Sequence, residues 1–505
     1  MTQLYYNEDS TDFFYHGDHT GGRGGANLDA FVDRIASAGV TTYLCNTNAS
    51  RANYDSAVWT STWEGFDPQG PDHQPYLAGL AADGQPVDVS GWRRLVTNTL
   101  ALHEQGIDYP AHTIERCRLR GMSPWITLRM NDVHEQINTK HPIHGHFWRD
   151  NPHLWRRNSD SYFGRAFDFS HVEVRDYYLA LVDETLERYD VDGLELDFLR
   201  EPFLFTVGEE DSGRELLSEW VGVVRQRIDA AAERRGHIIQ LGVRSPSKPC
   251  VAHAFGMDPL RWVRAGWLDL LVVSPRWSTI EFAMPLREWR EQLGGCSAVL
   301  AGGLEILRGD HAMGPKRPVT AAEARGAAAQ VLHDGADAVY LFNYFPSADA
   351  TTMPDAWARD AYEQTIASVA SLERIGPLTR THAITFADMI GPEGAVPDPP
   401  PQLPVEGVDL SFELPTGPRP VRGDGELVIG LSSKGEAPLA YVNDGGPLVM
   451  VSSAATGQLC HNHYALPIEL LVDDGQQNQI HLICQDSLRV ESVEIRILPT
   501  GTRIA

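Results

Sequence analysis

The fold is decided by the stretch Thr127-Leu128-Arg129-Met130-Asn131-Asp132-Val133-His134, which directly follows the apolar run Pro124-Trp125-Ile126. A second stretch, Gly193-Leu194-Glu195-Leu196-Asp197-Phe198-Leu199-Arg200, has the same character. In each, a buried strand is expected to end in a cluster of ionisable side chains. Such clusters are typical of barrel enzymes, which do their chemistry at the carboxyl ends of their strands.

Short apolar runs alternate with helical periodicity over roughly the first 370 residues, a pattern typical of a parallel sheet with crossover helices. The predicted strands are Leu4–Asn7, Thr42–Asn46, Trp125–Arg129, Gly193–Asp197, Ile238–Val243, Leu268–Ser274, Ala298–Ala301 and Ala338–Asn343. These units predict the α/β class and a (β/α)8 TIM barrel. A doubly wound open sheet is the structural alternative.

The sequence changes character after the barrel. A segment rich in glycine and proline, 391–401, excludes regular structure and is followed by short β-like runs. These runs are Leu427–Leu431, Leu439–Val442, Leu448–Val451, Ile468–Leu471, Gln479–Cys484 and Val493–Leu498. We predict a catalytic barrel over residues 1–373 and a β-sandwich accessory domain over residues 374–505. The long connections after the second and third strands, 47–109 and 131–170, are predicted to be lids or substrate walls.

Bulk properties exclude several classes of partner. The 505 residues carry a formal net charge of −26, which argues against nucleic acid and anionic membranes. The sequence lacks an apolar run of about eighteen residues and a leader-like amino terminus, so we expect a soluble cytoplasmic protein of bacterial type. Six scattered cysteines fit reduced core residues, with a Cys460–Cys484 disulfide as the alternative. A homodimer is our working expectation for assembly.

Arginines stand out in so acidic a chain, because five of them follow five different predicted strands. They are Arg129, Arg200, Arg244, Arg276 and Arg308. A guanidinium matches a carboxylate or phosphate with two parallel hydrogen bonds, so this set predicts an anionic substrate. Asn46 and Asn343, at two further strand ends, are candidate substrate-binding residues. The alternative is that each arginine pairs with a neighbouring Asp or Glu in the barrel mouth.

Two carboxylates of the fourth strand, Glu195 and Asp197, lie two positions apart and therefore point the same way, into the barrel. Neighbouring buried carboxylates perturb each other's pKa, which makes them candidate acids and bases. Glu195 with Glu305 would also form the carboxylate pair of a retaining glycosidase. The alternative is that these carboxylates hold the arginines in place.

His134 is the strongest single candidate for a catalytic residue. Histidine gains and loses a proton near neutral pH, and an anionic substrate favours its protonated form, which suits a general acid. The alternative is a structural histidine in the core or bound to water. The histidines within 16–19 and 141–146 lack the spacing and carboxylate partners of a metal site, so we expect no metal and no other cofactor.

The strand-end residues, above all Arg129-Met130-Asn131-Asp132-Val133-His134, and the plan of a barrel followed by a sandwich resemble glycoside hydrolase family 156, the inverting exosialidases. The resemblance covers essentially the whole chain. It implies a sialylated glycan or sialoside as substrate, a histidine acid, an aspartate base, a single displacement and no metal. Carried over, the acid falls on His134, and Arg129 becomes a ligand of the substrate carboxylate. The strand-end positions supply the other candidate substrate-binding residues, Arg200, Arg244, Arg276, Asn46, Asn343 and Glu195.

The resemblance leaves the base open. Asp132 is two positions from His134 and is better suited to orient it, whereas Asp9 or Asp12 could reach the other face of the sugar. Two other functions compete with the sialidase. One is a retaining glycosidase that uses Glu195 and Glu305 on neutral or uronic sugars, and the other is a catalytically silent carbohydrate-binding protein.

Overall fold

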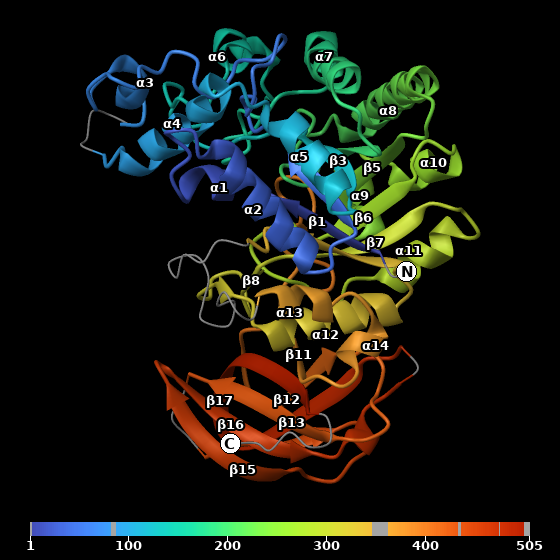
Figure 1. Cartoon of the computed structure of the whole chain (residues 1–505). Coiled ribbons are helices and arrows are strands. Elements are labelled where there is room, and N and C mark those ends of the chain that lie inside the picture. Colours follow the sequence, from blue (N-terminus) through green and yellow to red (C-terminus); the bar gives the residue numbers. More distant parts are fainter. Residues whose placement is uncertain (1–2, 82–86, 346–361, 433–435, 474, 499–505) are drawn as a thin grey trace.

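The computed structural model describes residues 3–81, 87–345, 362–432, 436–473 and 475–498, and it contains a closed parallel β-barrel (Figure 1). The barrel strands are β1 (Leu4–Glu8), β2 (Thr42–Asn46), β3 (Ser123–Arg129), β4 (Gly193–Asp197), β5 (Gln240–Pro246), β6 (Leu270–Ser274), β7 (Val299–Leu304) and β10 (Ala338–Phe342). They follow one another around the barrel in chain order, and β10 closes it by pairing with β1. Each predicted run overlaps one of these strands, so the predicted (β/α)8 barrel is confirmed.

Helices surround the barrel and carry the chain back from one strand to the next (Figure 1). The longer ones are α2 (Gly24–Ser37), α5 (Tyr109–Leu119), α7 (Val172–Arg188), α8 (Glu210–Arg235), α11 (Leu286–Leu293) and α12 (Ala321–His333). The shorter ones are α1 (Thr11–Tyr15), α9 (Pro249–Ala254), α10 (Pro259–Arg264), α13 (Tyr362–Ser368) and α14 (Leu372–Ile375). Within the described ranges, none of the helices is both long and apolar enough to span a bilayer.

Large side chains fill the interior of the barrel near the start of its strands. Tyr5 and Trp125 meet edge to face with 6.3 Å between ring centroids, and Tyr340 packs in the same cluster. Gly193 makes room for this cluster, since a Cβ there would lie 2.2 Å from the Trp125 indole. This packed floor leaves the polar side chains further along the strands facing the open end of the barrel.

The two long connections predicted as lids are folded. The first contains α3 (Pro75–Ala78) and α4 (Ser90–Glu104), and the second contains α6 (His146–Asp150) and the 3₁₀ helix η2 (Pro152–Leu154). Treating the first as a plain connection was wrong for α4, which has 15 residues. The sequence hides this helix because Val89 precedes it and provides no side-chain cap.

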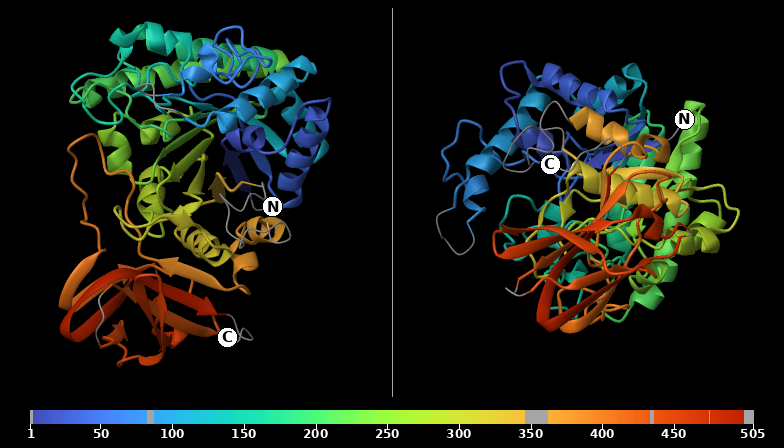
Figure 2. Two further views of the ribbon diagram at one scale, coloured as in Figure 1. Left: turned by 90° about the vertical axis from the view of Figure 1, so that its left-hand side faces the viewer. Right: turned by 90° about the horizontal axis from the view of Figure 1, so that it is seen from below.

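The C-terminal part is a seven-stranded antiparallel sheet with its own hydrophobic core, set at one end of the molecule (Figures 1 and 2). Its strands are β11 (Arg380–Ala383), β12 (Val405–Leu414), β13 (Asp424–Leu431), β14 (Leu439–Val442), β15 (Val449–Thr456), β16 (Leu459–Leu466) and β17 (Asn478–Leu498). The predicted C-terminal β-domain is therefore confirmed as a fold.

Three of the predicted runs differ from the observed elements, and the strands β11, β12 and β16 were not predicted. The runs Gln479–Cys484 and Val493–Leu498 are the two ends of one strand, β17, which has 21 residues and pairs with β11, β12, β13 and β14. The expectation of a strand over Ile468–Leu471 was wrong, because η4 (Ile468–Leu470) is a 3₁₀ helix. Pro467, which precedes it, has no N–H to donate to a strand ladder.

Arg308 joins the barrel to the C-terminal sheet. It lies in β8 (Leu307–Arg308), which pairs with β9 (Arg317–Pro318), and its guanidinium is fully buried. It forms ion pairs with Glu323 of α12, with Asp310 at 2.5 Å and with Glu494 of β17 at 2.7 Å. The expectation that Arg308 belongs to the anion-binding set was therefore wrong.

All six cysteines are free thiols. Cys45 and Cys117 are buried, and burial raises the pKa of the Cys45 thiol to about 12. Cys250 is exposed, so the expectation of a core position was wrong for this residue.

Candidate active site

Five side chains at the C-terminal end of the barrel form one connected row of ion pairs and hydrogen bonds, which we call the ionic row. Asp9, just after β1, pairs with Arg129 at the end of β3. Arg129 Nη1 donates to Asp132 Oδ2 at 3.2 Å, and Asp132 Oδ1 lies 2.8 Å from His134 Nδ1. Arg200, after β4, places its Nη2 2.6 Å from His134 Nε2. The structure thus brings these predicted site residues together from three strands.

The hydrogen bonds fix the protonation of His134 in this arrangement. A guanidinium can only donate, so His134 Nε2 accepts from Arg200 and its Nδ1–H donates to Asp132. Burial alone would raise the pKa of Asp132, but His134, Arg129 and Arg200 hold it well below its usual range. Asp132 is therefore an anion that orients the imidazole. In this arrangement the lone pair of His134 Nε2 faces Arg200.

Two turns set the direction of the side chains in the row. Asn48, after β2, clamps the backbone of Arg129: the Arg129 N–H donates to its Oδ1 at 3.1 Å, and its Nδ2 donates to the Arg129 carbonyl at 3.0 Å. Asp197, at the end of β4, accepts from the backbone N–H groups of Leu199 and Arg200, both at 3.1 Å. Asp side chains commonly hold turns in this way.

The turn that follows His134 is strained. Glu135 has φ of 56°, in the left-handed region that residues with a Cβ rarely adopt. Its carbonyl oxygen lies 3.1 Å from Nε2 of the buried His144, whose ring stacks on Trp148 at 3.9 Å. Burial lowers the pKa of His144 to about 4, so this histidine is neutral at pH 7. The buried His144 contact holds the strained turn and, with it, the direction of His134.

Arg200 has donors to spare. Its Nε and Nη1 are buried and meet no hydrogen-bond acceptor in the described parts of the chain. Leaving buried donors of a charged group unsatisfied is costly, so this guanidinium is poised to take an acceptor from a ligand. An anionic acceptor would satisfy it best.

Two aspartates follow β1. Asp9 lines the cleft described below, its N–H donates to Asn343 Oδ1 at 2.8 Å, and Asn343 Nδ2 donates to Asp9 Oδ2 at 3.2 Å. Asn343 follows β10 and also has a left-handed φ, of 60°. Asp12 lies in α1, buried, with its Oδ1 3.5 Å from His16 Nε2. Asn46 is buried at the end of β2 and does not line the cleft.

A cleft of about 670 Å³ opens over part of the ionic row and is lined by Asp9, Arg129 and His134, whereas Asp132 and Arg200 do not line it. Its outer wall comes from α1 and the two long connections and includes Tyr15, Arg51, Trp92, His141 and Ile143. Arg51 holds the wall together by donating to the backbone carbonyls of Ser61, Glu64 and His144. The strand-end rule missed these residues, and the abundance of Trp and His in the connections was the available signal.

Two predicted substrate-binding arginines are already paired with carboxylates. Arg244 is fully buried, 3.1 Å from Asp197 and 2.8 Å from Glu305. Arg276 donates from one nitrogen to both carboxylate oxygens of Glu201, each at 2.8 Å. These geometries fit the alternative reading, in which such arginines pair with carboxylates of the barrel mouth.

Glu195 and Glu305 lie outside the set of residues that line the cleft. Glu195 accepts from Thr127 at 2.7 Å and from Asn7 and Tyr340, each at 3.0 Å. Burial raises the pKa of Glu195 to about 7 and that of Glu305 to about 8, against the opposing effect of Arg244. Both carboxyl groups therefore hold a proton well above the pH range of an ordinary glutamate.

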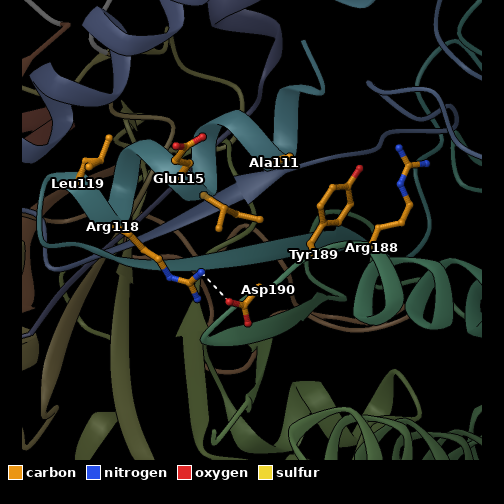
Figure 3. Close-up of a pocket in the computed structure, with 8 residues that line it drawn as sticks. Ala111, Glu115, Arg118, Leu119, Arg188, Tyr189 and Asp190 are labelled. Carbon is orange, nitrogen blue, oxygen red and sulfur yellow. Dashed lines mark hydrogen bonds and ion pairs between the residues drawn. The ribbon is translucent and has the colours of Figure 1, made fainter. Parts of the chain in front are cut away.

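A second depression, of about 430 Å³, lies between α5 and the end of α7 (Figure 3). Arg118 crosses it to pair with Asp190 at 2.8 Å, and Leu119 and Tyr189 border it. These residues precede β3 and β4, so the depression is at the end of the barrel where strands begin. Barrel enzymes do their chemistry at the opposite end, where the cleft lies.

Among the described residues, no cluster of three or more His, Cys, Asp or Glu side chains is arranged to hold a metal ion. The histidines considered in the sequence have other contacts. His19 stacks on Phe13 at 4.0 Å with its Nε2 2.7 Å from the Phe13 carbonyl, and His146 pairs with Glu64 at 3.0 Å.

Comparison with known proteins gives no family. No family model matches the chain, and no curated protein matches it. Among solved structures, it is similar to α-L-fucosidase isoenzyme 2 from Paenibacillus thiaminolyticus, with 15% identity, a TM-score of 0.43, 74% of this chain covered and 49% of that one. The chain therefore spans about half the length of that fucosidase.

Two further structures are similar over most of their own length. A maltogenic α-amylase from Thermotoga neapolitana has 11% identity and a TM-score of 0.40, with 95% of this chain and 98% of that chain covered. The glycoside hydrolase domain of PgaB from Bordetella bronchiseptica has 10% identity and a TM-score of 0.41, with 74% and 99% covered. Likeness at this level does not decide the chemistry of this chain, which depends on the side chains in the cleft.

The raised pKa of Glu305 predicts a pH dependence of stability. Between its ordinary value of 4.5 and its folded value of about 8, the folded protein keeps a proton that the unfolded chain has lost. Stability contributed by this proton is complete below the ordinary value and is lost as the pH rises towards the folded value. Glu305→Gln mimics the protonated carboxyl. Between pH 5 and pH 8 we expect the wild type to lose about 1 kcal/mol of unfolding free energy per pH unit more than this variant does.

Urea unfolding at several pH values measures this difference. Glu187→Gln changes an exposed carboxyl and is the matched control, which should follow the wild type. Parallel loss of stability in the wild type and in Glu305→Gln would mean that Glu305 is ionised throughout this range.

Proposed function

We propose that this chain is a glycoside hydrolase that removes terminal 2-linked sialic acids from glycans by a single inverting displacement. The observation that carries the proposal is the group formed by Asp132, His134 and Arg200. It places a candidate proton donor beside a guanidinium that has two unsatisfied nitrogens. The resemblance of the strand-end residues to glycoside hydrolase family 156 supports the same reaction.

The substrate carboxylate explains the geometry around Arg200. A sialic acid carries its carboxylate on the anomeric carbon, directly beside the bond that is cleaved. In the proposed complex, Arg200 turns its free donors to this carboxylate and releases His134 Nε2. Asp132, which stays ionised, then favours a proton at the released nitrogen. Substrate binding in this way generates the acid that the reaction needs.

Protonated His134 donates its Nε2 proton to the glycosidic oxygen as the bond to the anomeric carbon breaks. Arg129 lies in the cleft between Asp9 and Asp132 and is the second candidate for contact with the substrate carboxylate. The wall that contains Tyr15 and Trp92 would face the rest of the substrate.

Inversion follows from the charge of the substrate. A carboxylate nucleophile would have to approach an anomeric carbon that already bears a carboxylate, and the two anions repel each other. A water molecule, deprotonated by a more distant aspartate, avoids this contact. Asp9 or Asp12, both after β1, supplies this base. Asp9 faces the cleft but is bound to Arg129, whereas Asp12 is buried beside His16.

Loss of the acid should depend on the leaving group. His134→Ala is expected to lower kcat for a sialyl-lactose substrate by about 10²–10⁴-fold, because an alkoxide leaves poorly without a proton. For a nitrophenyl sialoside, whose leaving group needs no proton, the loss should be far smaller. Steady-state kinetics with both substrates measure the difference.

Glu195→Gln and Glu305→Gln are the controls for this experiment, because they alter the carboxylates of the competing glycosidase. The proposal would be overturned if His134→Ala kept full activity while Glu195→Gln and Glu305→Gln were inactive. That result would make Glu195 and Glu305 the catalytic residues.

Arg200 should decide the preference for an anion. Calorimetric titration of the wild type should show tighter binding of sialic acid than of its neutral 1-carboxamide. Arg200→Met keeps a long apolar side chain but removes the donors. We expect this variant to bind the acid about 10–100-fold more weakly and to lose most of its preference over the carboxamide, because hydrogen bonds to a charged group contribute about 1.5–3 kcal/mol. An unchanged preference would assign the carboxylate to a different arginine.

A pair of substitutions identifies the base. Asp9→Asn and Asp12→Asn each remove one candidate base. The variant that lacks the true base should have a kcat about 10²–10⁴-fold lower for both leaving groups. If the base is Asp12, Asp9→Asn should mainly raise KM, because Arg129 loses the carboxylate that holds its guanidinium in position. Proton NMR of the first-formed sugar should show an anomeric configuration opposite to that of the substrate. Retention of configuration, or near wild-type kcat in both variants, would exclude the inverting mechanism with these residues.

A further inference from the structure

The strand β15 forms an edge of the C-terminal sheet and is exposed along its whole length. It pairs with β16 on one side, and among the described strands nothing pairs with its other side. All eight of its residues are exposed. Three consecutive apolar residues, Val449, Met450 and Val451, are 70%, 46% and 55% exposed. An edge of this kind presents free backbone donors and acceptors to any strand that can reach it.

The edge also lacks charge. Residues 448–459 contain no Asp, Glu, Lys or Arg, in a chain whose formal net charge is −26. Natural edge strands are commonly protected by charged residues or proline, and the eight residues of β15 include neither. A bulge between Met450 and Ser452 bends the strand but leaves its outer side unpaired within the described sheet.

We propose that β15 is the interface of a homodimer, in which the β15 strands of two copies pair antiparallel about a two-fold axis between Ser452 and Ser453. This register is complementary in size at Met450 and Val451, which face small side chains, whereas Val449 faces Thr456. It places Met450 opposite Ala455 and Val451 opposite Ala454, each of these pairs occurring twice. Cross-strand pairs of this kind are the unit of sheet stability.

A groove beside the strand extends this interface. It has a volume of about 710 Å³, and Leu448, Val449, Val451 and Leu470 are among the residues that line it. In the same register, the turn at Gly457 of one copy comes to lie against Leu448 of the other, at the mouth of the groove. Pairing therefore covers part of an apolar surface as well as the strand edge.

The second copy is favoured over another partner by symmetry and charge. A two-fold axis uses the free edges of both copies, so the assembly closes at two subunits. An uncharged strand offers nothing to a basic or acidic peptide, and along β15 itself two highly negative copies pair without placing like charges opposite each other. The strand lies in the C-terminal sheet, at the end of the molecule away from the barrel (Figure 1).

Two double variants test the pairing. Val451→Lys with Ala454→Lys places like charges opposite each other at both symmetric positions, whereas Val451→Glu with Ala454→Lys places opposite charges there. Sedimentation equilibrium of the full chain should show a dimer for the wild type and for the Glu/Lys variant. For the Lys/Lys variant, the dissociation constant should rise by about tenfold or more. Both changes affect exposed side chains, and circular dichroism checks that the fold is kept.

Hydrogen exchange tests the same interface without a substitution. The backbone amides of 449–456 should exchange more slowly as the wild-type concentration passes through the dissociation constant. A wild type that stays monomeric, a Lys/Lys variant that dimerises as well as the wild type, or loss of the dimer in both double variants would overturn the proposal. So would a dimer whose formation leaves exchange at 449–456 unchanged.

Discussion

The site depends on one interaction, the ionic row of Asp9, Arg129, Asp132, His134 and Arg200. Each charge in the row faces a partner of the opposite kind or a hydrogen-bond acceptor, so charges that would be costly alone are kept at a largely buried position. The two ends of the row differ. Asn343 satisfies Asp9 at one end, whereas Arg200 has unsatisfied donors at the other end within the described structure. In the proposed complex, an anion joins the row at this second end, beside the histidine.

The rest of the structure fixes this row in place. The floor around Trp125 fills the barrel below it, and Gly193 provides the space that the indole needs. Asn48 clamps the backbone of Arg129, and His144 holds the strained turn after His134. These supports come from the strands and from the two long connections. The connections therefore serve the site twice, as walls of the cleft and as the source of the contacts that orient the histidine.

The sequence predicted the barrel well because its strands are short apolar runs that end in polar residues, a pattern that depends on local order alone. It also placed Arg129, Asp132, His134 and Arg200 at strand ends. The sequence could not show which way each side chain points or which partner it binds, because both depend on residues far apart in the chain. Arg308 follows the seventh strand, but its partner Glu494 belongs to the C-terminal sheet. The strands β11, β12 and β16 were missed, and η4 was mistaken for a strand because its apolar run is too short to show a period.

The net charge of −26 makes the local charges of the ionic row important for binding an anion. The overall field repels an anionic sugar, but salt screens it over about 8–10 Å, so the attraction has to be local. Arg244 and Arg276 do not supply it, because Arg244 pairs with Asp197 and Arg276 pairs with Glu201, and Arg129 lies between two aspartates. Arg200 faces a neutral imidazole and keeps its positive charge. In the proposed mechanism a neutral sugar would not draw this guanidinium away from His134 Nε2. Recognition of the anion and protonation of the acid therefore depend on one movable contact, and that contact would restrict catalysis to substrates that carry a carboxylate.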